Sequence, residues 1–479
     1  MKALHIAAEL FPHVKVGGLA DVMGALPLAL GKEGIYARLL LPAYPALMQV
    51  AKVYSEEAQF PDLMGSGPAK LLLADVPGSV TVYLLDAPGF FARDGSPYDD
   101  HGDTHRRFAA LSWVAAQLAI NGGADGMQFD ILHAHDWQTA LAPIFANFLH
   151  GNHRPKTVLT VHNLAYQGVF PRHILDEIWL PKEAYHLNGA EYFGQINFLK
   201  GGLAYADAIT TVSPTYAKEI QDKEGGYTLD GMMQHRSSDL HGILNGVDEQ
   251  VWNPAKDQHL QTPFSKKDLK KAKAYNKKKF QNEMGLGENV NSPLFGVVSR
   301  LNAIKGLDMV LANIDHLVSN GAQLVVIGKG DGDFESAFCE AASRYPGSVA
   351  VYVGYDEGKA HRAMAASDIL LVPSRSEPCG LTQLYAMRYG ALPIGRKTGG
   401  LADTIVDISE ETLKDGTATG FLFIDADSWH LGEAITRAIE LYKNEPKIWH
   451  SVQLQAMGRH FTWANSALQY VALYKSLVE

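Results

Sequence analysis

Two similar glycine-containing stretches lie near opposite ends of the chain. Residues 15–22 read KVGGLADV and residues 397–404 read KTGGLADT, so six of the eight positions are identical. Each stretch follows an apolar run that predicts a strand, and the first stretch opens a helical pattern. A strand, paired glycines and a helix can direct backbone N–H groups and the positive end of a helix at an anion. The repeat indicates two halves built on one plan, with a structural tight turn as the alternative for each copy.

Two cations follow a predicted strand in the second half. The strand at residues 294–299 runs into Arg300, and Lys305 follows in the same loop. Arginine can hold a diphosphate through its bidentate fork, and lysine can act on it as a point charge. We interpret the pair as a pyrophosphate site; a surface ion pair is the alternative.

A carboxylate follows another predicted strand of that half. Glu377 lies in a proline-bounded turn, PSRSEPCGLT, between the strand at 369–372 and an apolar helix. A carboxylate in this position can bind sugar hydroxyls while the N–H groups that follow it face a phosphate. The alternative is that Glu377 caps the helix.

Polar residues also end the predicted strands of the first half. The strand at 129–132 runs into HAHDW, which includes Asp136, and the strand at 157–161 runs into His162 and Asn163. Ligands bind beyond the carboxyl ends of strands in open parallel sheets, so chemistry is expected there. A packed core histidine is the alternative for His162.

Two common phosphate-binding motifs are missing from the sequence. It contains no G-x-x-x-x-G-K-[ST], and its first predicted strand is not followed by G-x-G-x-x-G. Neither a P-loop nucleotide triphosphatase nor a dinucleotide enzyme is therefore indicated.

Strands and helices alternate in both halves, which favours two doubly wound parallel sheets over one large sheet. A hairpin is expected at 71–85, a helix at 107–120 and the last strand of the first half at 242–248. The second half has predicted strands at 294–299, 323–327, 349–353, 369–372 and 392–394, and a mostly helical tail at 429–477. Eight lysines lie between residues 266 and 279. We interpret them as a solvated helical face, with a polyanion site as the alternative.

The composition is that of an ordinary soluble globular protein. Of the 479 residues 47% are hydrophobic and 20% are charged, and the net charge of −10 argues against nucleic acid or an acidic membrane as a partner. Two cysteines supply neither a disulfide framework nor a cysteine-rich metal site. The sequence has no apolar run long enough for a membrane span, and we expect the cytoplasm as its compartment.

Taken together, the motifs resemble those of bacterial glycogen synthase and plant starch synthase. They are K-x-G-G-L-A-D, H-A-H-D-W, T-V-H-N-L-A-Y-Q-G, L-N-G-V-D, S-R-L-x-x-x-K-G and P-S-R-x-E-P-C-G-L-T-Q, in the family's order and across essentially the whole chain. The resemblance implies a GT-B fold of two Rossmann-like domains. Residues 1–248 would form the acceptor-side domain, completed by a C-terminal helix at about 458–479, and residues 249–457 the donor-side domain.

The same resemblance implies the reaction. Glucose would pass from ADP-glucose to the non-reducing end of an α-1,4-glucan, with retention of anomeric configuration and with no metal or cofactor. ADP-glucose and the glucan would be the partners.

Roles of individual residues follow from the resemblance alone. Arg300 and Lys305 would hold the diphosphate, Glu377 would bind hydroxyls of the transferred glucose, and His162 and Asp136 would contact the sugar near the reacting carbon. The other residues implied in donor binding are Lys15, Gly17, Gly18, Asp21, Asn163, Asn245, Tyr355, which would stack on adenine, Cys379, Gly380, Leu381 and Thr382.

One position departs from related retaining transferases. They often carry a second glutamate eight positions after the first, where this chain has Tyr385. We therefore assign no covalent nucleophile. Alternatives at other positions are a small buried hydrophobe for Cys379, a loop aromatic without a ligand for Tyr355, and a solvated neighbour for Lys397.

Three other functions remain open at this point. The chain could use UDP-glucose or another nucleotide sugar, because the strand-end pattern predicts a diphosphate more firmly than a base. It could be a catalytically silent glucan-binding protein, although the joint presence of Lys15, Arg300, Lys305 and Glu377 argues against this. A glucan phosphorylase would need a pyridoxal-binding lysine site and normally a longer chain.

Overall fold

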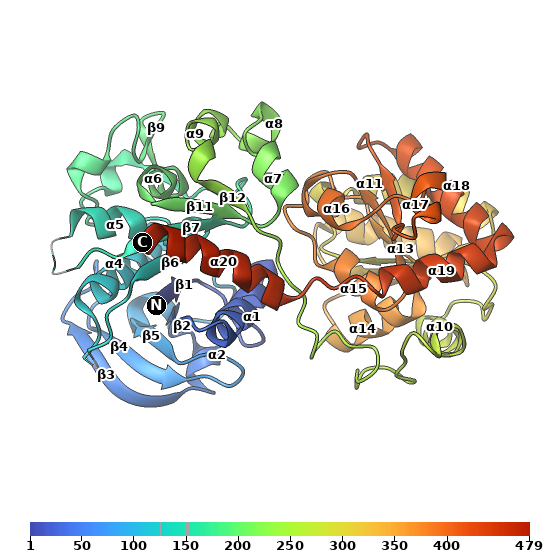
Figure 1. Ribbon diagram of the computed structural model, residues 1–479, viewed down its shortest axis with the longest axis horizontal. Coiled ribbons are helices and arrows are strands. Elements are labelled where there is room, and N and C mark those ends of the chain that lie inside the picture. The colour runs from blue at the N-terminus through green and yellow to red at the C-terminus, as the bar shows by residue number, and fades with distance from the viewer. Residues whose placement is uncertain (125, 150, 152) are drawn as a thin grey trace. The chain divides into compact units, whose positions relative to one another are not determined.

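The computed structural model describes residues 1–124, 126–149, 151 and 153–479, which form two compact units (Figure 1). The first unit contains Met1–Gly246 and Trp463–Glu479, and the second contains Val247–Thr462. The units divide after residues 246 and 462, where the sequence predicted divisions after 248 and about 457.

The first unit is built on a sheet in the order β12-β11-β7-β6-β1-β2-β5-β4-β3. Neighbours from β12 to β5 are parallel, and β4 and β3 add an antiparallel edge. Its strands are β1 (Lys2–Ile6), β2 (Tyr36–Pro42), β3 (Lys52–Phe60), β4 (Ala69–Asp75), β5 (Val82–Asp86), β6 (Ile131–His135), β7 (Lys156–Val161), β11 (Ala208–Thr211) and β12 (Leu240–Gly242). A small separate sheet contains β8 (Val169–Pro171), β10 (Gln195–Asn197) and β9 (Glu191–Tyr192).

The helices of the first unit include one from the far end of the chain. Helix α20 (Trp463–Val478) packs against α1 (Gly18–Lys32) and buries its inward face in the core of this unit (Figure 1). The other helices are α2 (Pro45–Met48), α3 (Pro88–Phe91), α4 (Thr104–Asn121), α5 (Ala142–Phe148), α6 (Phe198–Tyr205), α7 (Pro214–Glu219), α8 (Lys223–Gly226) and α9 (Asp230–His235), with short 3-10 turns at Trp137–Thr139, Arg172–Ile174, Lys182–Ala184 and Ser237–Asp239.

The second unit has one parallel sheet in the order β15-β14-β13-β16-β17-β18. Numbered from its own first strand this is 3-2-1-4-5-6, the order of a Rossmann sheet. The strands are β13 (Leu294–Val298), β14 (Gln323–Gly328), β15 (Val349–Val353), β16 (Ile369–Val372), β17 (Leu392–Arg396) and β18 (Phe421–Phe423).

Helices again connect these parallel strands. They are α10 (Leu269–Met284), α11 (Leu307–Ala312), α12 (Ile314–Ser319), α13 (Gly332–Arg344), α14 (Glu357–Ala366), α15 (Thr382–Arg388), α16 (Gly399–Thr404), α17 (Glu410–Lys414), α18 (Ser428–Asn444) and α19 (Pro446–Ala456), with a 3-10 turn at Ala303–Lys305. Both units are thus doubly wound, as the alternation of elements predicted.

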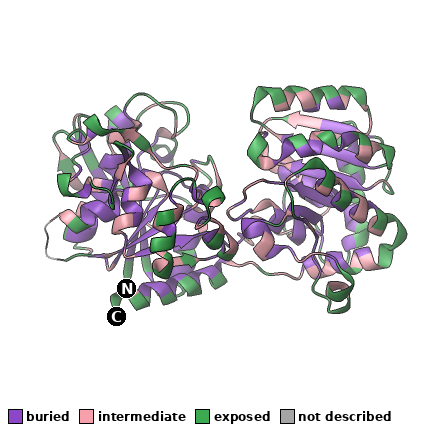
Figure 2. Cartoon of the chain, turned by 90° about the horizontal axis from the view of Figure 1, so that it is seen from above, coloured by how far each residue is buried: buried purple, intermediate pink, exposed green. Residues whose placement is uncertain are grey.

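Burial explains why the parallel strands read as apolar runs. In β2 and β14 nearly every residue is buried, because each strand is covered on both faces. Figure 2 shows the buried residues concentrated along the strands and the exposed residues along the outer sides of the helices. Among the described residues, no helix combines the length and the apolarity that crossing a bilayer requires.

Some predicted elements are wrong in detail. The strand expected at 242–248 is absent, because β12 ends at Gly242. The histidines of HAHDW lie inside β6 and not beyond it, so that His133 and His135 are fully buried.

The lysine-rich segment forms α10, but its face is not wholly solvated. Lys277 makes a buried ion pair with Asp368, with Nζ 2.6 Å from Oδ2. The Lys273 ammonium donates to three backbone carbonyls, and burial lowers the pKa of Lys273 to about 7. The prediction of a solvated face is wrong for these two lysines, because α10 packs against α14.

Candidate active-site residues

The second unit places its candidate residues at the point where the strand order reverses. Strands β13 and β16 are adjacent and parallel, and the chain leaves β13 into Arg300 and leaves β16 into the turn that contains Glu377. This is the position at which open α/β sheets bind ligands. Arg300 is exposed, and no carboxylate among the described residues pairs with its guanidinium.

Glu377 and Lys305 are brought into direct contact. The Lys305 ammonium lies 2.6 Å from Glu377 Oε2, and the Ser374 hydroxyl donates to the same oxygen at 2.7 Å. Glu377 is only 8% exposed, so both bonds act where water screens them weakly. An ammonium has three N–H donors, so Lys305 can hold Glu377 and still donate to a phosphate.

An arginine that the sequence analysis did not select connects the two loops. Arg375 forms a bidentate pair with Asp308 at 2.6 and 2.7 Å and donates to Ala303 O at 2.7 Å. Its backbone N–H also donates to Ile304 O. Arg375 therefore fixes the Lys305 loop to the Glu377 turn. No spacing rule singles it out, because its partners come from a different strand end.

The second glycine pair, Gly399 and Gly400, packs against the backbone of the Glu377 turn. Gly400 N donates to Glu377 O at 3.0 Å. A Cβ at Gly399, whose φ is +44°, would lie 2.1 Å from Glu377 O, and one at Gly400 would lie 1.8 Å from Cys379 O. These glycines are needed because backbone passes directly against backbone.

The residues after Glu377 lead into α15. Cys379 is buried, Gly380 has φ +69°, and Leu381 and Thr382 are half-buried at the start of the helix. Tyr385 lies in α15, at the position where related transferases often carry a second glutamate. Its ring stacks on Trp252 with the ring centroids 3.8 Å apart, and it is a core residue.

Tyr355 lies apart from this group. It is 70% exposed in the loop before α14, and its hydroxyl bonds to Glu357.

In the first unit, backbone amides of the first glycine stretch bind the carboxylate of a nearby residue, Glu9. The amides of Val16 and Gly17 donate to Glu9 Oε2 at 2.8 and 2.9 Å, and Lys15 pairs with Asp21 at 2.9 Å. Gly17 precedes α1, whose first residue is Gly18. Glu9 was missed in the sequence because nothing in its spacing relates it to the loop.

Asp136 and His162 meet beyond the ends of β6 and β7. Asp136 Oδ1 accepts from the amides of His162 at 2.7 Å and of Asn163 at 3.4 Å, and Asp136 itself has a φ of +61°. Burial raises the pKa of the Asp136 carboxyl to about 7, against the lowering effect of those two amides. A non-glycine residue whose backbone is held at a positive φ at a strand end is typical of a functional position.

Asn245 lies on the irregular segment after β12. It is 5% exposed, and its Oδ1 has no hydrogen-bond donor among the described residues. A buried amide oxygen without a donor is available to a ligand hydroxyl.

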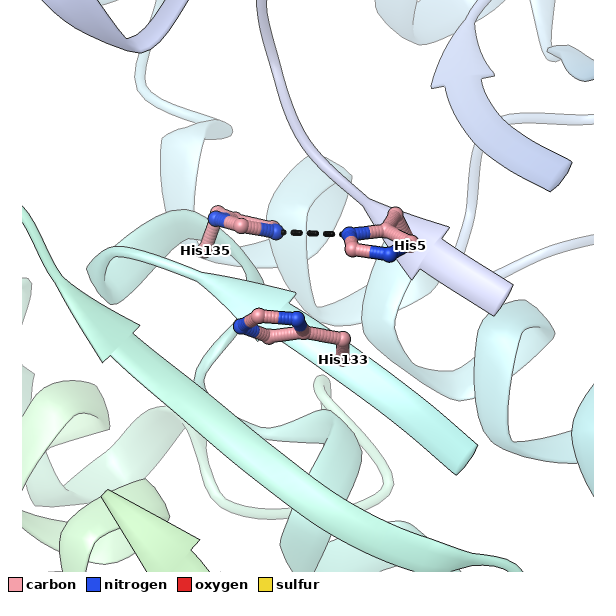
Figure 3. A group of neighbouring side chains, drawn as sticks. All are labelled: His5, His133 and His135. Atoms are coloured by element: carbon pink, nitrogen blue, oxygen red, sulfur yellow. Dashed lines mark hydrogen bonds between the residues drawn. The ribbon is translucent and has the colours of Figure 1, made fainter. Parts of the chain in front are cut away.

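Three buried histidines of the first unit form a cluster that the sequence did not predict. Figure 3 shows His5, His133 and His135 together, with His5 Nδ1 3.1 Å from His135 Nε2. The ring nitrogens are close enough to hold a metal ion. However, both nitrogens of His133 are engaged at 2.6 Å, by Tyr474 and by Thr160. A metal would need a free lone pair on a ring nitrogen of each histidine, and these two hydrogen bonds already occupy both nitrogens of His133.

Comparisons with known proteins cover the whole chain. Residues 2–235 match the family described as "Starch synthase catalytic domain", and residues 278–450 match "Glycosyl transferases group 1". A glycogen synthase of Francisella tularensis subsp. novicida (strain U112) is 46% identical over 488 residues, which cover 100% of this chain and 99% of that protein. A glycogen synthase of Francisella tularensis subsp. tularensis (strain WY96-3418) is 45% identical with the same coverage.

Two solved structures share the fold of this chain. The catalytic domain of starch synthase IV from Arabidopsis thaliana, bound to ADP and acarbose, superimposes with a TM-score of 0.91 at 33% identity, and 99% of each chain is covered. A sucrose-phosphate synthase from Thermosynechococcus elongatus has a TM-score of 0.62 at 16% identity, covering 99% of this chain and 98% of that one, and shares the fold alone.

Proposed function

This chain belongs to the glycogen synthase and starch synthase family of glycosyltransferases, which elongate a glucan, and we propose that its donor is ADP-glucose. The resemblance read from the motifs and the two-domain fold class are confirmed. The donor is supported by the starch synthase neighbour, whose structure contains ADP together with acarbose.

The observation that carries the proposal is the group of Arg300, Lys305 and Glu377 at the strand reversal of the second unit. We assign the diphosphate of the donor to the two cations and hydroxyls of the transferred glucose to Glu377. As the bond between the anomeric carbon and the β-phosphate oxygen breaks, negative charge grows on the departing ADP. Fixed cations stabilise this charge more than they stabilise the intact donor, and so lower the barrier.

The first unit takes the acceptor side in this proposal. A hydroxyl at the non-reducing end of the glucan attacks the anomeric carbon, and its proton leaves with the departing phosphate. Asp136, His162 and Asn245 are assigned to sugar contacts, and Lys15 with the adjoining glycines to the donor. Tyr385 is packed in the core, so the chain offers no second carboxylate there, and we assign no covalent intermediate.

The reaction proposed here needs neither a metal nor a cofactor, because Arg300 and Lys305 supply the positive charge that a metal supplies elsewhere. The expected result is that activity in excess EDTA stays within about twofold of the untreated enzyme. Loss of activity in EDTA with recovery on adding Mg²⁺ would contradict this part.

The deciding experiment incubates purified protein with glycogen and either ADP-glucose or UDP-glucose. Release of nucleotide and length of the glucan chains are both followed. We expect elongation with ADP-glucose and a much lower rate with UDP-glucose. No elongation with ADP-glucose would refute the proposed donor, and elongation with UDP-glucose alone would assign a different nucleotide sugar.

A further inference from the structure

A continuous hydrogen-bonded chain of side chains crosses the core of the first unit and ends at His162. From the buried end, Thr210 Oγ1 lies 2.6 Å from Thr160 Oγ1, which lies 2.6 Å from His133 Nε2. The other nitrogen of His133 lies 2.6 Å from the Tyr474 hydroxyl on α20.

The chain continues from Tyr474 to the candidate site. The Tyr474 hydroxyl lies 3.4 Å from His5 Nε2, which makes this the longest link. His5 Nδ1 is 3.1 Å from His135 Nε2, a contact seen in Figure 3, and His135 Nδ1 is 3.1 Å from His162 Nε2. His162 Nδ1 is then the ring nitrogen left for a ligand.

The four histidines of this hydrogen-bonded chain are neutral. Burial lowers the pKa of His5 and of His162 to about 3, and it lowers the pKa of His133 and His135 well below the ordinary value. A neutral imidazole donates from one nitrogen and accepts at the other. Each ring that accepts a hydrogen bond from one neighbour must therefore donate one to the other neighbour. All donors along the hydrogen-bonded chain then point the same way, either toward His162 or toward Thr210.

The buried end selects between these two states. Thr210 is fully buried, and among the described residues its hydroxyl has Thr160 as its one polar partner. If His133 donated to Thr160 and Thr160 to Thr210, the Thr210 proton would have no acceptor, which costs about 1–3 kcal/mol. Donation therefore starts at Thr210 and runs toward His162.

We propose that Tyr474 is a positioning residue for His162: the chain that passes through its hydroxyl holds His162 with its proton on Nδ1, so that a neutral N–H donor faces the substrate. His162 would then donate to an oxygen of the sugar and could not act as a base at that nitrogen. The effect on catalysis rests on the proposed function, whereas the position of the proton does not.

The first experiment measures the position of the His162 proton without depending on catalysis. The full chain, labelled with ¹⁵N-histidine and without ligand, is examined by NMR, and the His162 signals are assigned with a His162→Gln variant. We expect a protonated Nδ1 and an unprotonated Nε2. A proton on Nε2 in the wild-type protein overturns the proposal, whether or not the enzyme elongates glucan.

Tyr474→Phe removes one hydroxyl and breaks the chain in its middle. We expect the His162 proton to distribute over both nitrogens, and kcat with ADP-glucose and glycogen to fall about tenfold, while KM for the donor changes less than about twofold. An unchanged spectrum with unchanged kcat overturns the proposal.

Ser466→Ala is the matched control on the same helix. It removes the hydrogen bond from the Ser466 hydroxyl to Leu244 O, which helps to seat α20, but it leaves the histidine chain intact. We expect the His162 spectrum and kcat of the wild type. An equal fall of kcat in both variants would show that only the seating of α20 matters, and would overturn the proposal.

Zinc provides an independent check, because the three clustered histidines could also bind a metal. We expect the purified protein to retain no zinc after incubation with it and gel filtration. One tightly held zinc per chain would occupy nitrogens that the hydrogen bonds require, and would overturn the proposal.

Discussion

At the scale of single residues, the candidate site depends on groups that are charged and nearly buried. Glu377 is stabilised by an ammonium and a hydroxyl on one oxygen, while Asp136 Oδ1 accepts from two backbone amides. The two carboxyls therefore lie in different electrostatic environments. Glu377 has a cation beside it, and burial raises the pKa of Asp136 to about 7. These environments lead to different predictions for the two groups.

Glu377→Gln is expected to lower kcat by about 10²–10³-fold without unfolding the protein. The amide keeps the shape of the side chain but loses the charge that orients Lys305 and binds sugar hydroxyls. Steady-state rates and circular dichroism measure the two effects. Ser374→Ala, which removes one of the two bonds to Oε2, should cost roughly tenfold or less. Retention of full turnover by Glu377→Gln would remove this residue from the site.

Asp136→Asn is expected to change how stability depends on pH. The folded pKa of Asp136 lies above its unfolded value, so its contribution to stability is complete below about pH 4 and is lost as the pH rises toward 7. Asparagine keeps an oxygen for the two amides and does not ionise. Between pH 4.5 and 7.5, the free energy of unfolding of the variant should rise by about 3 kcal/mol relative to wild type.

Denaturant titrations of both proteins at the two pH values measure this difference. Parallel stability curves would mean that Asp136 ionises in the folded protein as readily as it does in water.

At the scale of elements, the two copies of the glycine stretch have different structural roles. In the first copy, the amides of Val16 and Gly17 bind the carboxylate of Glu9, and a Cβ at Gly17 would meet nothing within 4 Å. In the second copy, Gly399 and Gly400 lie against the backbone of the Glu377 turn. Identical letters therefore mark two similar strand–loop–helix units but not two equivalent sites.

Substitution by alanine should separate the two copies. Gly399→Ala places a Cβ 2.1 Å from Glu377 O at a φ of +44°, so we expect a loss of roughly 3 kcal/mol or more of stability and a displaced Glu377 turn. Gly17→Ala, at a φ of −146°, should change stability by less than about 1 kcal/mol. Thermal midpoints of the two variants, compared with wild type, decide the matter. Equal destabilisation would mean that the copies are structurally equivalent.

Much of the element pattern was readable from the sequence, because parallel strands covered on both faces appear as short apolar runs. The predicted strands at 349–353 and 369–372 coincide with β15 and β16. The strand predicted at 242–248 was wrong, because this apolar run lies mostly in the irregular connection after β12. Such runs do not distinguish a strand from a buried loop.

The site was readable only in part. Residues at strand ends, such as Arg300 and Glu377, could be selected because parallel sheets collect ligands there. Glu9, Arg375 and Tyr474 could not, because each acts through partners that are remote in sequence. The buried histidines of β6 were predicted beyond the strand. A polar pair in an otherwise apolar strand is compatible with burial only when distant groups, here Thr160 and Tyr474, satisfy the nitrogens.

At the scale of the whole molecule, the last helix belongs to the unit that begins the chain. Residues of α20 are counted in the first core, including Trp463, Tyr470 and Tyr474, and the hydroxyl of Ser466 bonds to Leu244 O. Folding of the first unit therefore needs both ends of the chain, whereas the second unit is continuous from 247 to 462.

A chain that stops at residue 462 should lose the first unit selectively. Five large side chains of α20 are buried, and at about 1.5–3 kcal/mol for each, their removal forfeits on the order of 10 kcal/mol, as much as the total stability of a typical domain. The truncated chain should show one cooperative calorimetric transition, and limited proteolysis should degrade residues 1–246 while a fragment near 247–462 persists. The full chain under the same protease is the control. Survival of a fragment that contains residues 1–246 would show that the first unit folds without α20, and that Tyr474 is not required to complete its core.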